Sequence, residues 1–89
     1  MIVISYDIAD DKLRAKFSRL LTKNGAIRLQ YSVYEVNNTN RVIENLKLKI
    51  DDFAKKFDLD DSVIIFEVSS VKLKKYGNAI HRDEDIVFL

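Results

Sequence analysis

An apolar, β-branched run opens the chain at residues 1–8 and carries an acid only near its end. This composition is typical of a buried strand. Because side chains on a strand alternate between two faces, one face holds only large apolar or aromatic residues: Ile2, Ile4, Tyr6 and Ile8. The other face begins with Val3, becomes polar at Ser5 and ends on Asp7. We expect the first face to form core, and the carboxylate of Asp7 needs a separate explanation.

Two segments show the apolar spacing of amphipathic helices. The first begins after Asp10 or Asp11, either of which can cap it, and ends at Asn24-Gly25. Its apolar positions are Leu13, Phe17, Leu20 and Leu21. The second follows a polar turn at residues 37–40 and extends to about residue 57. Its apolar positions are Val42, Ile43, Leu46, Ile50, Phe53 and Phe57.

The remaining apolar segments predict strands. Residues 26–36 alternate between apolar and polar side chains, which predicts one amphipathic strand with Tyr31 on its apolar side. Residues 62–68 form a short apolar run flanked by charge, which predicts a second central strand. Residues 71–76 predict a short lysine-rich edge strand, and residues 85–89 predict a last short strand.

These elements predict an α+β fold in a single domain spanning residues 1–89, with the split βαβ layout and both helices on one side of an antiparallel sheet. Residues 2–4 and 63–68 are apolar on both strand faces, so the uncovered side of the sheet needs a cover. A chain of 89 residues also gains from burying surface against a second copy. We therefore expect a homodimer, in which a two-fold axis brings two Asp7 carboxylates near each other.

Composition narrows the class of protein. Hydrophobic residues make up 47% and charged residues 33% of the chain, and no apolar run approaches the roughly 20 residues of a membrane helix. The chain has no cysteine, which excludes disulfides and thiolate metal sites. No basic leader segment precedes the first strand. We expect a soluble protein that acts in the cytoplasm without contact to a membrane.

The net charge of +1 hides an uneven distribution. Residues 12–28 contain six basic residues and no acidic one: Lys12, Arg14, Lys16, Arg19, Lys23 and Arg28. Four of them recur at steps of four, three and four, which places them in a narrow stripe on the first helix: Lys12, Lys16, Arg19 and Lys23. This basic stripe is either a solvated helix face or a surface that binds phosphates.

Several of these positions together resemble the CRISPR-associated Cas-two (Cas2) family. The similar residues are Tyr6-Asp7-Ile8 at the end of the first strand, Arg14 and Lys16 on the first helix, Gly25 at its end, and residues 28–35 on the second strand. The resemblance spans nearly the whole chain and agrees in order, spacing and length. It implies a ferredoxin-like fold of βαββαβ type, a homodimer, and in many members a metal-dependent nuclease that acts on RNA or DNA. It also implies a role with the Cas-one integrase in acquiring spacers.

The resemblance assigns roles residue by residue. It places Asp7 at the catalytic acidic position that binds magnesium or another divalent cation, with Tyr6 as its neighbour. Its basic positions match Arg14, Lys16 and Arg28, and its aromatic position matches Tyr34. Lys16 stands where arginine is common, and an ammonium group lacks the bidentate geometry with which a guanidinium binds phosphate.

The chemistry of phosphodiester hydrolysis agrees with this assignment. The reaction needs charge neutralisation on the phosphate and an activated water, and a hard cation held by carboxylates supplies both. With one such acid per chain, the site is complete only in a dimer. The alternative interpretation makes Asp7 a cap or a solvated strand end, Asp10 and Asp11 helix caps, and His81 a solvated side chain.

Three functions remain open at this point. The first is a metal-dependent endonuclease. The second is a non-catalytic scaffold that holds duplex DNA and the integrase, which needs only the dimer, the basic stripe and an accessible terminal strand. The third is a small-molecule-binding regulatory dimer of similar layout, and the unpaired basic stripe counts against it.

Overall fold

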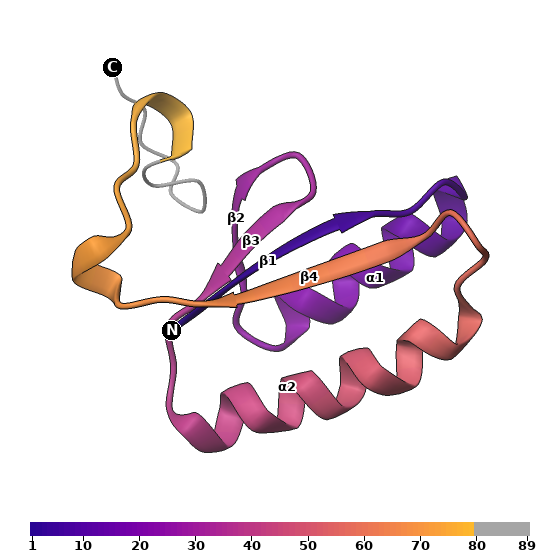
Figure 1. Ribbon diagram of the computed structural model, residues 1–89, viewed down its shortest axis with the longest axis horizontal. Coiled ribbons are helices and arrows are strands. Elements are labelled where there is room, and N and C mark those ends of the chain that lie inside the picture. Colours follow the sequence, from indigo (N-terminus) through magenta and orange to yellow (C-terminus); the bar gives the residue numbers. More distant parts are fainter. Residues whose placement is uncertain (80–89) are drawn as a thin grey trace.

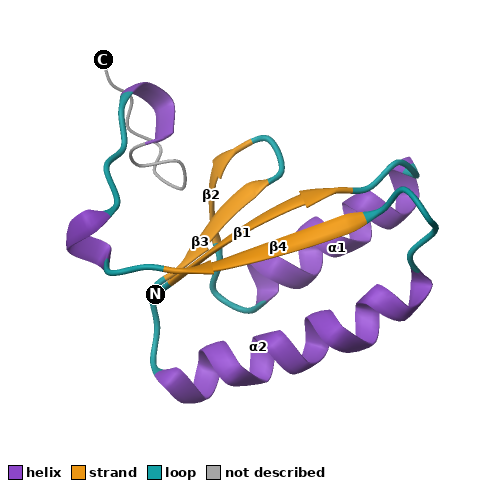
Figure 2. Cartoon of the chain, viewed as in Figure 1, coloured by secondary structure: helices purple, strands orange, loops and turns teal. Residues whose placement is uncertain are grey.

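In the part of the chain that the structure describes, four antiparallel strands form one sheet in the order β2-β3-β1-β4. The computed structural model describes residues 1–79 (Figure 1). The strands are β1 (Ile2–Asp7), β2 (Ile27–Gln30), β3 (Val33–Val36) and β4 (Ser62–Glu67). The helices are α1 (Asp11–Lys23) and α2 (Asn40–Phe53), followed by the short 3-10 turns η1 (Ala54–Lys56), η2 (Ser70–Lys72) and η3 (Gly77–Ala79). This order confirms the predicted βαββαβ layout (Figure 2).

The core lies between one face of the sheet and the two helices. On β1 the predicted core face is confirmed, since Ile2, Ile4 and Tyr6 are all buried. Phe17 and Leu21 of α1 pack into the same cluster. The buried residues of α2 are Ile43, Leu46 and Ile50. Within residues 1–79, neither helix is long and apolar enough to cross a membrane.

Local capping explains where α1 begins and ends. The Asp10 carboxylate accepts a hydrogen bond from the backbone N–H of Leu13 at 2.8 Å, so Asp10 rather than Asp11 is the N-cap. At the other end Gly25 adopts φ +89°, a conformation that side chains with a Cβ rarely tolerate. In α2 the hydroxyl of Thr39 caps the helix by accepting from the N–H of Val42.

The prediction of a single strand over residues 26–36 is wrong. β2 and β3 form a hairpin whose turn contains Tyr31 and Ser32. Ser32 adopts φ +71° at this turn, and its carbonyl accepts a hydrogen bond from the N–H of Tyr6 at 3.1 Å. The turn is not evident from the sequence, because residues 31–32 include neither glycine nor proline. The alternation of apolar and polar residues also continues on both sides of the turn.

Two further sequence predictions are corrected. Among the strands of residues 1–79, residues 62–67 do not form a central strand, because β4 lies at the end of the strand order and pairs with β1 alone. Residues 71–76 do not form an edge strand, because η2 begins at Ser70 and irregular backbone follows it. The predicted strand at residues 85–89 and the residue His81 lie outside the described part of the chain.

The sheet face opposite the helices, here called the open face, is covered in part by the chain itself. Leu29 is 5% exposed although it does not belong to the main core cluster. It lines a pocket of about 310 Å³ together with Val3, Val33 and residues 73–76. The segment after β4 therefore crosses the β2–β3 side of the open face, where a second copy of the chain was expected to pack.

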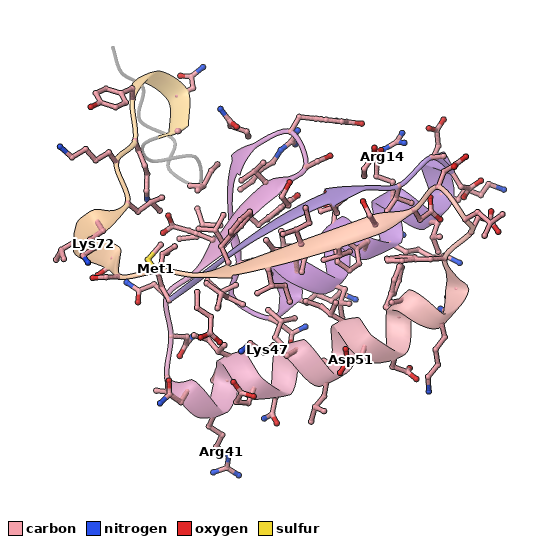
Figure 3. The ribbon with its side chains drawn as sticks, viewed as in Figure 1. Met1, Arg14, Arg41, Lys47, Asp51 and Lys72 are labelled. Atoms are coloured by element: carbon pink, nitrogen blue, oxygen red, sulfur yellow. The ribbon has the colours of Figure 1, made fainter. Side chains whose placement is uncertain are left out.

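Lys47 ties α2 to the edge strand. Its ammonium group lies 2.7 Å from a carboxylate oxygen of Glu67 at the end of β4 and 3.2 Å from one of Glu44. Figure 3 shows Lys47 on the side of α2 toward the sheet, whereas Arg41 points away from it. These charge-assisted contacts raise the pKa of Lys47, with the hydrogen bond to Glu67 as the main cause.

Candidate metal-site position and nucleic-acid interface

Asp7 ends β1 on the open face, directly opposite Ser62 of β4. Its side chain is exposed. In the part of the chain that the structure describes, no hydrogen bond or ion pair engages its carboxylate. Asp7 is therefore neither a helix cap nor half of a salt bridge within residues 1–79, and its oxygens are available to a cation or to solvent.

Three other acids at this end of β1 have partners within residues 1–79. Asp10 caps α1, and Asp11 forms an ion pair with Arg14. Asp61 accepts hydrogen bonds from the N–H groups of Ala9 at 3.0 Å and Asp58 at 2.9 Å. These two bonds lower the pKa of the Asp61 carboxyl. Unlike these three acids, Asp7 has no such structural task within residues 1–79.

The described part of one chain does not assemble a cluster of metal ligands. Among residues 1–79, no group of three or more His, Cys, Asp or Glu side chains is placed to hold a metal ion. The exposed carboxylate of Asp7 has the hard oxygen donors that magnesium prefers, but it is a single ligand. Asp7 can contribute one carboxylate ligand to a divalent cation, and a second copy of the chain could supply another.

Arg14 holds the loop between β1 and α1 (Figure 3). Its guanidinium donates to the carbonyl oxygens of Ile8 at 3.0 Å and Ala9 at 3.3 Å, and it pairs with the carboxylate of Asp11. The bond to Asp11 is the main reason that the pKa of Arg14 is raised. Two of these three contacts are therefore with the backbone that follows Asp7.

Tyr6 and Tyr34 lie on the helix side of the sheet, opposite Asp7. Their rings stack with centroids 6.0 Å apart, and the rings of Tyr6 and Phe17 form a T-shaped pair with centroids 4.9 Å apart. The hydroxyl of Tyr34 lies 2.5 Å from the hydroxyl of Ser18 on α1. Burial is the main cause of the raised pKa of Tyr6. The two tyrosines form the wall between the core and a surface pocket.

That pocket lies between α1 and the β2–β3 hairpin and has a volume of about 180 Å³. It is lined by Tyr6, Asp11, Arg14, Ala15, Ser18, Arg28, Tyr31 and Tyr34. The guanidinium carbon of Arg28 lies 5.3 Å from the centre of the Tyr31 ring. Tyr31 is 68% exposed. Sequence reasoning missed Tyr31 because a continuous strand over residues 26–36 placed it on an apolar face.

The basic stripe lies on the surface of α1. Lys12, Lys16, Arg19 and Lys23 are all exposed. None of the ion pairs within residues 1–79 involves any of them. The structure thus separates the six predicted basic residues into the four of the stripe, Arg14 at the loop and Arg28 at the pocket. It does not bring Asp7 together with them, because Asp7 lies on the open face.

Comparisons with known proteins agree with this fold. The family model of CRISPR associated protein Cas2 matches residues 1–76. CRISPR-associated endoribonucleases Cas2 from two strains of Thermus thermophilus are 40% identical over 55 residues, which cover 62% of this chain and 57% of each relative. The chain therefore aligns with little more than half the length of these relatives. The crystal structure of a hypothetical protein from Thermus thermophilus superposes with a TM-score of 0.67 at 31% identity, covering 85% of this chain and 88% of that one.

Proposed function

Because this chain belongs to the CRISPR associated protein Cas2 family, we propose that it serves CRISPR adaptation as a homodimeric scaffold that binds duplex DNA and the Cas-one integrase. The observation that carries this proposal is the basic stripe of α1. Four exposed cations without anionic partners within residues 1–79 form a surface that suits the regularly spaced phosphates of a duplex.

The energetics of α1 favour a binding role for the stripe over a solvated face. Like charges three or four residues apart destabilise a helix by about 0.2–0.5 kcal/mol per pair. The stripe contains three such neighbouring pairs, and nearby acids do not relieve them within residues 1–79. Phosphate groups bound along the stripe would remove this repulsion and release counterions.

Replacing the stripe tests the scaffold. The stripe variant replaces all four residues, Lys12, Lys16, Arg19 and Lys23, with Gln. We expect it to bind duplexes more weakly, and to a similar extent for duplexes of unrelated sequence. Binding should also become less sensitive to salt, with the slope of log K against log salt falling by about 0.9 for each phosphate that the variant no longer neutralises. The measurement is fluorescence anisotropy at several salt concentrations.

The control removes the same charge elsewhere. The control variant replaces four exposed basic residues outside the stripe with Gln: Arg41, Lys55, Lys56 and Lys72. It should keep most of the affinity for duplexes and most of the salt dependence. Equal losses of affinity in both variants would show that the stripe acts only through the net charge of the protein. Unchanged binding in the stripe variant would make it a solvated face.

The second candidate function is a metal-dependent endonuclease that acts on RNA or DNA. Its support is the exposed carboxylate of Asp7, which has no partner within residues 1–79, and the relatives from Thermus thermophilus are named endoribonucleases. In a two-fold dimer, one Asp7 from each chain would hold magnesium or another divalent cation. A bound cation neutralises charge on the phosphate and activates water.

Asp7→Asn separates the two functions. The amide keeps the size of the side chain but removes its charge, so magnesium-dependent cleavage of RNA or DNA should fall by orders of magnitude. Titration calorimetry with magnesium or manganese should show that binding disappears, while the dimer and integrase-supported spacer integration persist. Asp60→Asn is the matched control, because Asp60 is also an exposed aspartate. Cleavage at the wild-type rate in Asp7→Asn would overturn the metal assignment.

A further inference from the structure

The pocket beside the β2–β3 hairpin contains an aromatic ring that the scaffold role does not use. Tyr31 is 68% exposed at the tip of this hairpin. A large ring held at the surface beside cationic groups is the combination that proteins use to bind unpaired bases. Such a site also needs a group that binds the adjacent phosphate.

The hairpin turn anchors the backbone that carries the ring. Ser32, the next residue, adopts φ +71°, which is uncommon outside glycine. Its carbonyl accepts a hydrogen bond from the N–H of Tyr6, so the turn is tied to the end of β1. The backbone that carries Tyr31 is thereby anchored to the sheet, and little ordering is needed when a ligand arrives.

Arg28 is the guanidinium in this pocket that remains available. Arg14 already donates to two backbone carbonyls and pairs with Asp11. Arg28 is exposed, takes part in no ion pair within residues 1–79, and lies over the Tyr31 ring at 5.3 Å. It can move to a phosphate and keep contact with the ring edge, since both its stacking and its bidentate geometry suit such a site.

We infer that Tyr31 and Arg28 form a subsite for one unpaired nucleotide, in which the base stacks on the Tyr31 ring and Arg28 contacts the adjacent phosphate. The inference rests on the proposed nucleic-acid-binding function and specifies its ligand. A base inside a duplex is already stacked on both faces, so the ring binds only at single-stranded ends, flaps or forks. The basic stripe binds any duplex, whereas this subsite distinguishes frayed duplexes from blunt ones.

The test compares three probes of equal sequence: a blunt duplex, the same duplex with unpaired overhangs, and a single strand that contains 2-aminopurine. Tyr31→Ala should lower affinity for the overhang probe and the single strand by roughly five- to 150-fold, and leave affinity for the blunt duplex unchanged. Tyr31→Phe keeps the ring and should retain binding. Quenching of 2-aminopurine fluorescence should occur in wild type and Tyr31→Phe and disappear in Tyr31→Ala.

Two further variants make the outcome decisive. Arg28→Gln should lower affinity for the overhang probe and reduce the number of phosphates neutralised, read from its salt dependence, by about one. The stripe variant should weaken the blunt and overhang probes alike. The subsite is overturned if Tyr31→Ala leaves the affinity for the blunt and the overhang probe unchanged, or lowers both affinities equally. This holds even if the stripe variant shows that the stripe binds duplexes. If the wild type binds no probe, the proposed function and the subsite both fail.

Discussion

The carboxylate of Asp61 joins two loops that lie 52 residues apart in sequence. One oxygen accepts from the N–H of Ala9, two residues beyond Asp7, and the other accepts from the N–H of Asp58. The next residue, Ser62, is the cross-strand neighbour of Asp7. Asp61 therefore holds the loop after Asp7 against the loop before Ser62. Its effect on the candidate metal ligand is to position the backbone of Asp7.

Asp61 also predicts a dependence of stability on pH. Two N–H donors favour the ionised carboxylate, so its pKa is lower in the folded than in the unfolded chain. The stability it contributes is present above the unfolded pKa and is lost as the pH falls through the folded pKa. Asp61→Asn should therefore melt below wild type at neutral pH, and the difference should shrink in acid.

Thermal unfolding followed by circular dichroism over a pH series measures this difference. Asp60→Asn is the matched control, because Asp60 is an exposed neighbour on the same loop. It should melt like wild type at every pH. Equal melting temperatures for Asp61→Asn and wild type at neutral pH would show that the carboxylate does not hold the two loops together.

Residue-level prediction from the sequence succeeds where the cause is local. Helical spacing was enough to place Lys12 and Lys16 on one exposed stripe, and strand alternation was enough to place Asp7 opposite the core. The contacts of Arg14 with the carbonyls of Ile8 and Ala9 depend on how the loop folds, and no sequence pattern encodes them. Tyr31 was missed because the turn that contains it has neither glycine nor proline.

At the scale of elements, the segment after β4 shows how tertiary contacts override a local pattern. The sequence predicted a lysine-rich edge strand, but the chain crosses the open face instead. Glu35 of β3 is 8% exposed, and its carboxylate lies 2.5 Å from the ammonium group of Lys75. Leu73 and Tyr76 line the same pocket as Leu29. An ion pair and apolar contacts with β2 and β3 thus outweigh pairing along an edge.

Lys75→Met tests this attachment. The substitution leaves a buried carboxylate without its cation, and breaking such a pair costs up to about 3–5 kcal/mol. Because the segment can lift away from the sheet, we expect local opening of residues 73–79 more than global unfolding. Hydrogen exchange should show faster exchange there, with the rest of the sheet still protected.

Two controls distinguish the loss of the ion pair from the effect of replacing any lysine of this segment by methionine. Lys74→Met changes an exposed neighbour and should leave exchange unchanged. Adding Glu35→Gln to Lys75→Met removes the unpaired charge and should restore part of the protection. Protection in Lys75→Met equal to that of wild type would mean that apolar contacts alone hold the segment.

At the scale of the whole molecule, the open face is partly uncovered in the structure of residues 1–79. On β4, Ile64 is 53% and Phe66 is 50% exposed, and both point to the same side as Val3 and Asp7 of β1. Adjacent exposed apolar side chains on a sheet are typical of an interface. The same face carries the Asp7 carboxylate of the candidate metal site, so one interface would cover the apolar side chains and bring two Asp7 residues together.

The last prediction is that the protein is a two-fold dimer through this face. Sedimentation equilibrium at micromolar concentration should give twice the chain mass of 10.4 kDa. Ile64→Lys or Phe66→Lys should weaken association by about 100-fold or more, because an unpaired ammonium buried at an interface costs several kcal/mol. Leu48→Lys is the control, since Leu48 is 66% exposed on α2 and should leave the dimer intact. A folded wild-type monomer would remove the basis for a shared Asp7 site and for the two-fold scaffold, and would leave the basic stripe to act on each chain alone.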